Sequence, residues 1–223
     1  MKKNAMLKIA AILMVAVLLT TCAISSTFAK YVTSKSDSDS ARVAKWGVDV
    51  VTTVDGLFLT EYDNKAVAST EAVVAPGTGS GEVSATSVIT GEPEVKVMVT
   101  SNVTLALTGW SVDGTFYCPL VFTVNGKTVN GLDHTSDVSL IGAIADAGKI
   151  EKTIEAGVKL DDYKDSNEKA INTAITWNWA FEDTNEGAKQ TNLKDTALGD
   201  AAADGNAPTI AITIETIVSQ LDN

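Results

Sequence analysis

Apolar residues recur at every second position in several separate stretches of this 223-residue chain. Near the C-terminal third, for example, Ile175, Trp177 and Trp179 share one parity while Thr176 and Asn178 occupy the other. A period of two is the side-chain repeat of a β-strand that buries one face. The same alternation predicts strands at 44–50, 95–100, 103–108, 120–124, 171–181 and 209–218, and a return strand that starts at Thr128.

Strands with one apolar face each suit two antiparallel sheets packed face to face. We therefore predict an all-β fold, a β-sandwich that forms a single domain over residues 43–223. A sandwich of this size remains one domain, because all-β domains extend to roughly 200–250 residues. The residues expected in the core are Trp46, Trp177, Trp179, Phe181, Ile212 and Ile214.

Other local signals lie between the strands. Asn125-Gly126 favours a two-residue hairpin, because both residues tolerate positive φ angles. Apolar residues at helical spacing between 138 and 145 predict one short helix at 137–147. Segments rich in Gly, Asp, Asn and Thr, notably 76–81 and 183–192, are expected to be surface loops.

The first 29 residues have the composition of a secretory signal peptide. Lysines precede an unbroken apolar run at 9–19, and Thr27-Phe28-Ala29 places small residues where a signal peptidase reads. The run is about half of the roughly 20 residues that span a bilayer as a helix, which argues against a retained anchor. We predict a signal peptide helix at 1–29, cleavage between Ala29 and Lys30, and a mature protein outside the cytoplasm.

Two other processing sites stay open, and both lie upstream. Cleavage after Ala23 is one, and a lipoprotein site at Cys22 is the other. The lipoprotein site is disfavoured because Thr21 stands where a smaller residue is normally needed. In each case residues 30–42 follow as a serine- and aspartate-rich segment, which is typical of a flexible N-terminal arm.

The charge of the chain excludes several classes of partner. The formal net charge is −11, and removal of 1–29 takes away three lysines and no acids, which leaves 14 basic against 28 acidic residues and a charge of −14. Such a chain repels nucleic acid and anionic membranes. The acidity is typical of an extracellular soluble protein. The rarer alternatives are cation binding and a surface that keeps subunits apart until assembly is triggered.

The residue inventory does not describe an enzyme, and we predict no catalytic residue, metal site or cofactor. His134 is the single histidine, which excludes a zinc site that needs two histidines. Cys118 is the single cysteine after cleavage and lies in an apolar context, so we expect a buried thiol. The acidic segment 161–168 lacks the spacing of a calcium loop and is expected to be a solvated turn, with a weak Ca²⁺ contact as the alternative.

Three motifs together resemble the TasA/camelysin family, exported proteins of Gram-positive bacteria that use a SipW-type signal peptidase. The first is the cleavage region Thr27–Ser34 with the following Asp37–Trp46. The second is Thr176–Glu182, followed by Asp195–Gly199, and the third is the closing strand Ile210–Glu215 with Val218–Gln220. The motifs lie towards both ends of the chain and cover about a third of it.

The resemblance implies a jelly-roll sandwich whose mature form polymerises head to tail into biofilm matrix fibres. It implies that an N-terminal donor strand, here Lys30, Tyr31, Val32 and Thr33, adds to the sheet of the next copy. The implied partners are the chain itself, the signal peptidase during export, and a companion matrix or anchoring protein. The family also contains members described as metalloproteases, an activity that the single histidine does not support.

The sequence is therefore compatible with three functions. The first is a secreted structural subunit that assembles through its arm. The second is a monomeric secreted or cell-surface module that binds carbohydrate or a cell-wall ligand, which requires Trp110, Trp177 or Trp179 on a concave face. The third is a hydrolase, which requires paired acids or a site centred on His134 that converges in a pocket.

Overall fold

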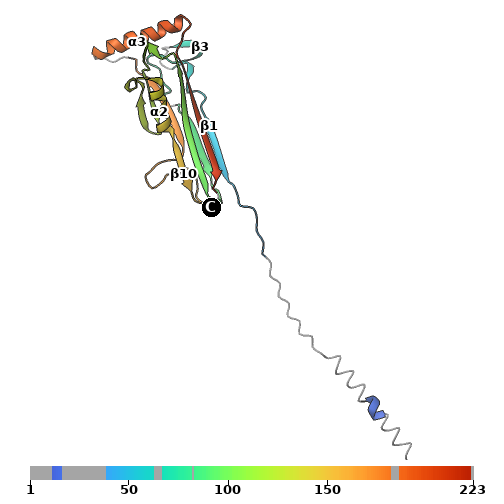
Figure 1. Ribbon diagram of the computed structural model, residues 1–223. Helices are drawn as coiled ribbons and strands as arrows, with labels where there is room; N and C mark the ends of the chain where they lie inside the picture. The colour runs from blue at the N-terminus through green and yellow to red at the C-terminus, as the bar shows by residue number, and fades with distance from the viewer. Residues whose placement is uncertain (1–11, 17–38, 63–66, 82, 182–185, 222–223) are drawn as a thin grey trace, which may run out of the picture. The chain divides into compact units, whose positions relative to one another are not determined.

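The computed structural model describes residues 12–16, 39–62, 67–81, 83–181 and 186–221 (Figure 1). The chain divides into two units, Met1–Arg42 and Val43–Asn223, and we call the second unit the body. In the first unit, residues 12–16 are helical. The expected cleavage site and donor strand lie outside the described residues; they comprise Ala29, Lys30, Tyr31, Val32 and Thr33.

The body is built mainly from antiparallel strands, which confirms the all-β class. A five-stranded sheet has the order β1-β4-β11-β8-β9, formed by Val48–Thr53, Ala85–Gly91, Thr173–Trp179, Leu120–Val124 and Lys127–Asn130. A three-stranded sheet has the order β10-β5-β12, formed by Ile150–Ile154, Val97–Thr108 and Thr209–Gln220. Two small hairpins complete the strands: β2 with β3, Leu59–Glu61 with Ala68–Val73, and β6 with β7, Ser111–Val112 with Thr115–Phe116.

The hairpin between β8 and β9 has the predicted two-residue turn. Val124 pairs with Lys127, so Asn125 and Gly126 alone form the connection. Their φ angles are +50° and +77°, the left-handed conformation that a type I′ turn requires at both positions. The Asn125 side chain also accepts a hydrogen bond from the Ala174 amide at 3.0 Å, which ties this turn to β11.

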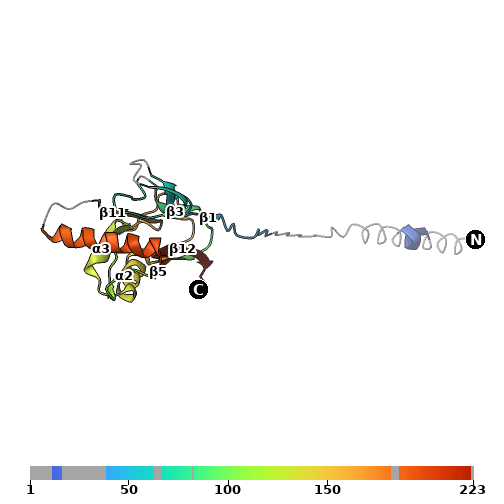
Figure 2. The same ribbon diagram turned by 90° about the horizontal axis from the view of Figure 1, so that it is seen from above.

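Helices are more extensive than predicted. The expected helix is present as α2, Asp137–Gly148, where the Ser136 hydroxyl accepts a hydrogen bond from the Ser139 amide as N-cap. A 3₁₀ turn, η1, precedes it at Gly131–Asp133. The prediction of a single helix is wrong, because α3, Glu186–Ala203, lies across one end of the body (Figures 1 and 2). Its first turns fall in the segment expected to be a loop.

The core lies where the buried faces of the two sheets meet. Strands of both sheets contribute to the larger apolar cluster, as do α2 and α3. Trp177, Trp179, Ile212 and Ile214 are all buried in it, with 2%, 5%, 8% and 7% of their surface exposed. Every buried residue of the described chain lies at or beyond Leu57 and so belongs to the body.

A row of hydroxyl groups crosses this core and joins the sheets. The Ser101 hydroxyl on β5 lies 2.7 Å from Thr173 Oγ1 on β11 and 3.0 Å from Thr216 Oγ1 on β12. Ser87 on β4 pairs with Thr173 across the strands and accepts a hydrogen bond from Thr52. Because the hydroxyls satisfy one another, they can be buried at low cost. They separate the larger apolar cluster from a smaller one towards the start of β5.

Two residues predicted for the core are at the surface. Trp46 is 42% exposed because the strand begins only at Val48, and Gly47 with a φ of +57° turns the chain before it. Phe181 is 64% exposed because β11 ends at Trp179, so the alternating pattern no longer has a sheet on which to pack.

The prediction that segment 76–81 is a surface loop is wrong, because the segment is hydrogen-bonded to a strand. The Gly77 and Ser80 amides donate to the Trp179 and Trp177 carbonyls at 3.0 and 2.9 Å, and the Trp179 amide donates to the Thr78 carbonyl at 2.8 Å. The segment therefore continues the five-stranded sheet beside β11, in the place that β4 occupies along Thr173–Ile175. Thr78 and Ser80 are buried as a result.

The long strands give the body two distinct ends. The chain enters the body at one of them, where the Glu94 amide donates to the Lys45 carbonyl and the Leu221 amide donates to the Lys96 carbonyl. The start of β12 and α3 lie at the other (Figure 1). β12 has 12 residues, which corresponds to a length of about 40 Å. The entry of the chain and α3 are therefore about one body length apart.

Candidate functional site

A cavity of about 440 Å³ lies beneath α3. Its walls come from segments that are far apart in the sequence: the residue before β2, the end of β3 and the residues after it, the turn after β5, the end of β11, one face of α3 and the start of β12. The lining residues are Phe58, Glu71, Ala72, Val73, Val74, Ala75, Pro76, Trp110, Trp179, Asp195, Leu198, Gly199, Ala202, Ala207, Pro208, Thr209 and Ile210.

Two tryptophans form the aromatic part of the wall. The rings of Trp110 and Trp179 lie 5.9 Å apart between centroids and are tilted by 53°. Trp110 donates its indole N–H to the Thr209 carbonyl at 2.8 Å, and Trp179 donates to Asp195 Oδ2 at 3.3 Å. These bonds fix both rings, because a buried indole that has found an acceptor loses that bond if it rotates.

Asp195 on α3 is the polar group in the wall. Its Oδ1 accepts a hydrogen bond of 2.6 Å from the Tyr117 hydroxyl, which also reaches the Thr191 carbonyl at 3.2 Å. Burial raises the pKa of the Asp195 carboxyl, although the bonds from Tyr117 and Trp179 act in the opposite direction. Burial and the neighbouring carboxylate also raise the pKa of Tyr117. This cluster attaches α3 to the sheets.

The cavity has a negative character. Glu71 on β3 is exposed at its mouth, and Asp195 stands in its wall. The lining of described residues contains no lysine or arginine, and the nearby Lys194 ammonium lies over the Tyr117 ring, 5.2 Å from its centroid. An apolar, aromatic pocket with two acids and no base suits a ligand that combines an apolar group with a positive charge.

A second hollow of about 500 Å³ lies on another side of Trp110. It is lined by the ends of β5 and β6 and by Thr135, Ser136 and Asp137 before and at the start of α2. His134 is close in sequence, and its Nδ1 lies 2.8 Å from Ser139 Oγ. Neither His134 nor Ser139 is among the residues that line this hollow or the cavity beneath α3.

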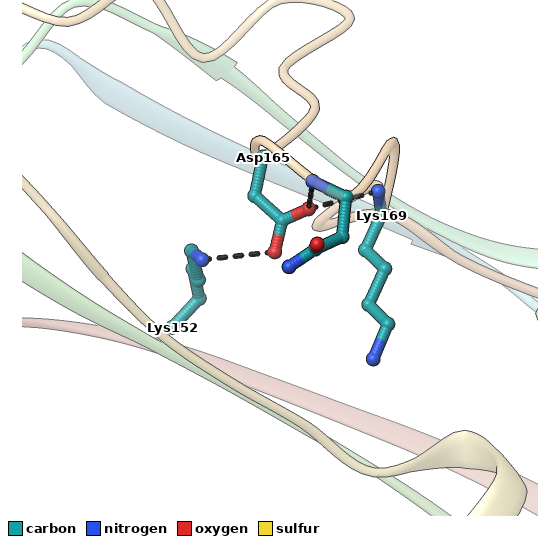
Figure 3. A network of polar contacts seen from close by, with 4 residues as sticks. Lys152, Asp165 and Lys169 are labelled. Carbon is teal, nitrogen blue, oxygen red and sulfur yellow. Dashed lines mark hydrogen bonds and ion pairs between the residues drawn. The ribbon is translucent and has the colours of Figure 1, made fainter.

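The acidic segment 161–168 is folded onto β10 by Asp165 (Figure 3). Lys152 Nζ lies 2.9 Å from Asp165 Oδ2, and Oδ1 accepts from the Asn167 and Lys169 amides at 2.8 and 3.0 Å. These contacts, led by Lys152, lower the pKa of the Asp165 carboxyl to about 2. Among the described residues, no group of three or more His, Cys, Asp or Glu is placed to hold a metal ion.

Cys118 is buried next to the core strand β8, as the sequence predicted. Burial raises the pKa of its thiol to about 11, so the thiolate is scarce at neutral pH. The thiol is therefore a packing group and not a nucleophile.

The tryptophans singled out for a binding module separate into two groups. Trp177 is deep in the core, where its indole N–H donates to the Leu57 carbonyl at 2.8 Å, whereas Trp110 and Trp179 line the cavity. The cavity residues Glu71 and Asp195 were not predicted as site residues. Asp195 falls within one of the motifs quoted above, but nothing in that motif indicates a cavity.

Comparison of the chain with protein-family models, with curated proteins and with solved structures gives no match. None of the helices in the described part of the chain combines the length and the apolar character needed to cross a membrane.

Proposed function

We propose that this protein is a secreted structural subunit that assembles head to tail into an extracellular matrix fibre. In this proposal the segment 1–29 directs export and is removed between Ala29 and Lys30, and residues 30–42 become an N-terminal arm. The arm of one copy adds as a donor strand to the body of the next. The two sheets of the body are the layers of a jelly-roll sandwich.

The observation that carries the proposal is the placement of unpaired strand edges relative to the entry of the chain. β3 and β12 are edge strands among the described residues, and both border the cavity at the α3 end. The chain enters the body at the opposite end. A segment that leaves one end and binds the other makes a heterologous contact that does not close, and such contacts generate filaments.

The body is suited to this role in a second respect. Among the described residues, every buried side chain lies at or beyond Leu57, and the residues before it that pack against the core, Val48, Val50 and Val54, belong to the body. In this proposal the arm is therefore available to a neighbour. The high negative charge keeps separate copies apart in solution. Association then depends on a specific contact and not on general stickiness.

Removal of the arm tests the proposal. A chain that begins at Lys30 should sediment as large polymers, and one that begins at Ser38 should sediment as a folded monomer, because it lacks the donor segment. Circular dichroism of both proteins verifies that the body is intact. Polymers of equal size from the shortened chain would refute assembly through the arm.

A monomeric binding module is the second candidate, and the cavity beneath α3 favours it. Trp110, Trp179 and Phe58 provide aromatic surface that stacks on sugar rings, and Asp195 and Glu71 provide acceptors for their hydroxyl groups. Screening of the body against a glycan array tests this alternative. Binding of a glycan to the body that is lost when the cavity is occluded would support a binding module and not a fibre subunit.

A further inference from the structure

The cavity beneath α3 is bordered on two sides by backbone without a strand partner in the described part of the chain. β3 pairs only with β2, and β12 pairs only with β5. Glu71–Val73 of β3 and Thr209–Ile210 of β12 line the cavity. The Val73 and Thr209 carbonyls already accept hydrogen bonds from the Tyr62 hydroxyl and the Trp110 indole N–H at 2.7 and 2.8 Å, so an added segment would pair with the other backbone groups of these edges. Strand edges present N–H and C=O groups that an extended segment can satisfy, while pockets between them take alternate side chains.

The walls of the cavity select the side chains of such a segment. Trp110, Trp179 and Phe58 provide aromatic surface, and the volume of about 440 Å³ accommodates a tyrosine side chain. Glu71 at the mouth and Asp195 in the wall are acidic, and no basic residue of the described lining neutralises them. The fitting segment therefore carries an aromatic residue next to a cation.

One segment outside the body has this chemistry. Lys30-Tyr31-Val32 places a cation, a phenol ring and a branched aliphatic side chain at consecutive positions. The other tyrosines belong to the body: Tyr62 and Tyr117 are buried, and Tyr163 packs against the smaller apolar cluster. Tyr31 is the one tyrosine of the sequence that precedes the body, and it lies outside the described residues.

We infer that the cavity is the acceptor site for Tyr31 of a second copy of this chain. Lys30–Thr33 lies as a short strand between β3 and the start of β12, with the Tyr31 ring against Trp110 and Trp179 and the Lys30 ammonium beside Glu71. This inference rests on the proposed function, because it names the surface through which the fibre grows. The cavity thereby selects the register of the arm as well as its binding.

A peptide titration measures the contact without polymerisation. A fluorescein-labelled peptide of residues Lys30–Asp37 is titrated with the body, residues 43–223, which forms one compact unit and holds every buried residue of the described chain. The expected result is saturable binding with a Kd below roughly 1 mM. A peptide with Tyr31→Ala should bind at least tenfold more weakly, and one with Ser34→Ala should bind as the original does.

Two matched glycine variants locate the binding site. A Cβ atom at Gly199, on the cavity face of α3, meets no heavy atom within 4 Å, and the same holds at Gly142, which lies on α2 away from the cavity. Gly199→Leu therefore adds a side chain to the lining of the cavity with no clash at its Cβ, while Gly142→Leu makes the same change elsewhere. Gly199→Leu should weaken the affinity of the body for the peptide at least tenfold, and Gly142→Leu should leave that affinity unchanged.

The outcomes separate this inference from the proposed function. Absence of peptide binding, or equal binding to the Gly199→Leu and Gly142→Leu bodies, overturns the inference, even if the chain beginning at Lys30 forms filaments. Binding that depends on Tyr31 and on an open cavity supports the inference. If that binding is found but the chain beginning at Lys30 stays monomeric, the fibre proposal fails and the cavity remains a site for this segment.

Discussion

Replacement of Trp177 by alanine should destabilise the body far more than the same change at Trp46. Trp177 is 2% exposed, its ring lies 5.4 Å from Phe58 and 6.1 Å from Tyr62, and its N–H bonds the Leu57 carbonyl. Trp46 is 42% exposed. Truncation of a buried tryptophan costs about 3–5 kcal/mol of unfolding free energy, because both apolar contact and packing are lost.

The hydrogen bond of Trp177 can be isolated by a smaller change. Trp177→Phe keeps an aromatic ring but leaves the buried Leu57 carbonyl without its donor, which costs about 1–3 kcal/mol. The order of stability should therefore be wild type, Trp177→Phe and Trp177→Ala, with Trp46→Ala within about 1 kcal/mol of wild type.

Urea and thermal unfolding, followed by far-ultraviolet circular dichroism, give the free energy of unfolding and the Tm of all four proteins without dependence on tryptophan fluorescence. For a body of this size, 1 kcal/mol corresponds to a shift of about 2–4 °C in Tm, so Trp177→Ala should melt roughly 6–20 °C lower. Equal losses for Trp46→Ala and Trp177→Ala would refute the assignment of the core. A negligible loss at Trp177 would do so as well.

Three further predictions concern ionisable groups. Since the pKa of Asp165 is lowered to about 2 from 3.8, its contribution to stability is complete above about pH 4 and is lost as the pH falls towards 2; Asp165→Asn should flatten this part of the stability profile measured by urea unfolding. Burial raises the pKa of the Asp195 carboxyl, so its protonated form favours folding, and this contribution to stability is lost as the pH rises through the folded-state pKa. The wild-type protein should therefore lose stability relative to Asp195→Asn from pH 3 to pH 8. A stability difference that is constant with pH would contradict the burial of the carboxyl. Cys118, with a thiol pKa of about 11, should react with a thiol reagent at pH 7.5 only after denaturation, and rapid labelling of the native body, followed by mass spectrometry, would show that the thiol is accessible.

The regular strands could be predicted because alternation is a local signal. In β11 the residues Thr173, Ile175, Trp177 and Trp179 all face the core, as their parity indicates. Parity continues past the end of a strand, however, and the sequence does not mark that end. Phe181 keeps the pattern of β11 but lies beyond Trp179, where no sheet covers it.

The prediction that Trp46 lies in the core is wrong for a different reason, which is a change of backbone conformation. Gly47 and Gly91 both have positive φ angles; Gly91 pairs with Val48 at the end of the β1–β4 ladder, and a Cβ on Gly91 would collide with the Gly47 carbonyl oxygen. A Cβ on Gly47 would approach the Glu92 carbonyl oxygen to 2.7 Å, so the close approach requires glycine. Only the pairing of two distant segments reveals this constraint.

The helix α3 was missed because it lacks a regular apolar stripe. Of the two leucines in this helix, Leu198 is buried and Leu193 is 65% exposed. Most of the other residues of the helix are polar or small. Its position depends instead on Asp195, whose carboxylate accepts from Tyr117 and Trp179. A contact between residues 78 positions apart has no local sequence signal. The cavity that α3 covers was therefore also beyond prediction.

Electron microscopy of the purified chain beginning at Lys30 tests the central claim most directly. A second chain that keeps additional residues before Lys30 is examined beside it, with size-exclusion chromatography of both. The account predicts filaments from the first chain and monomers from the second, because only a released arm can enter the body of a neighbour. Monomers from the chain beginning at Lys30, over a range of pH and Ca²⁺ concentration, would contradict it.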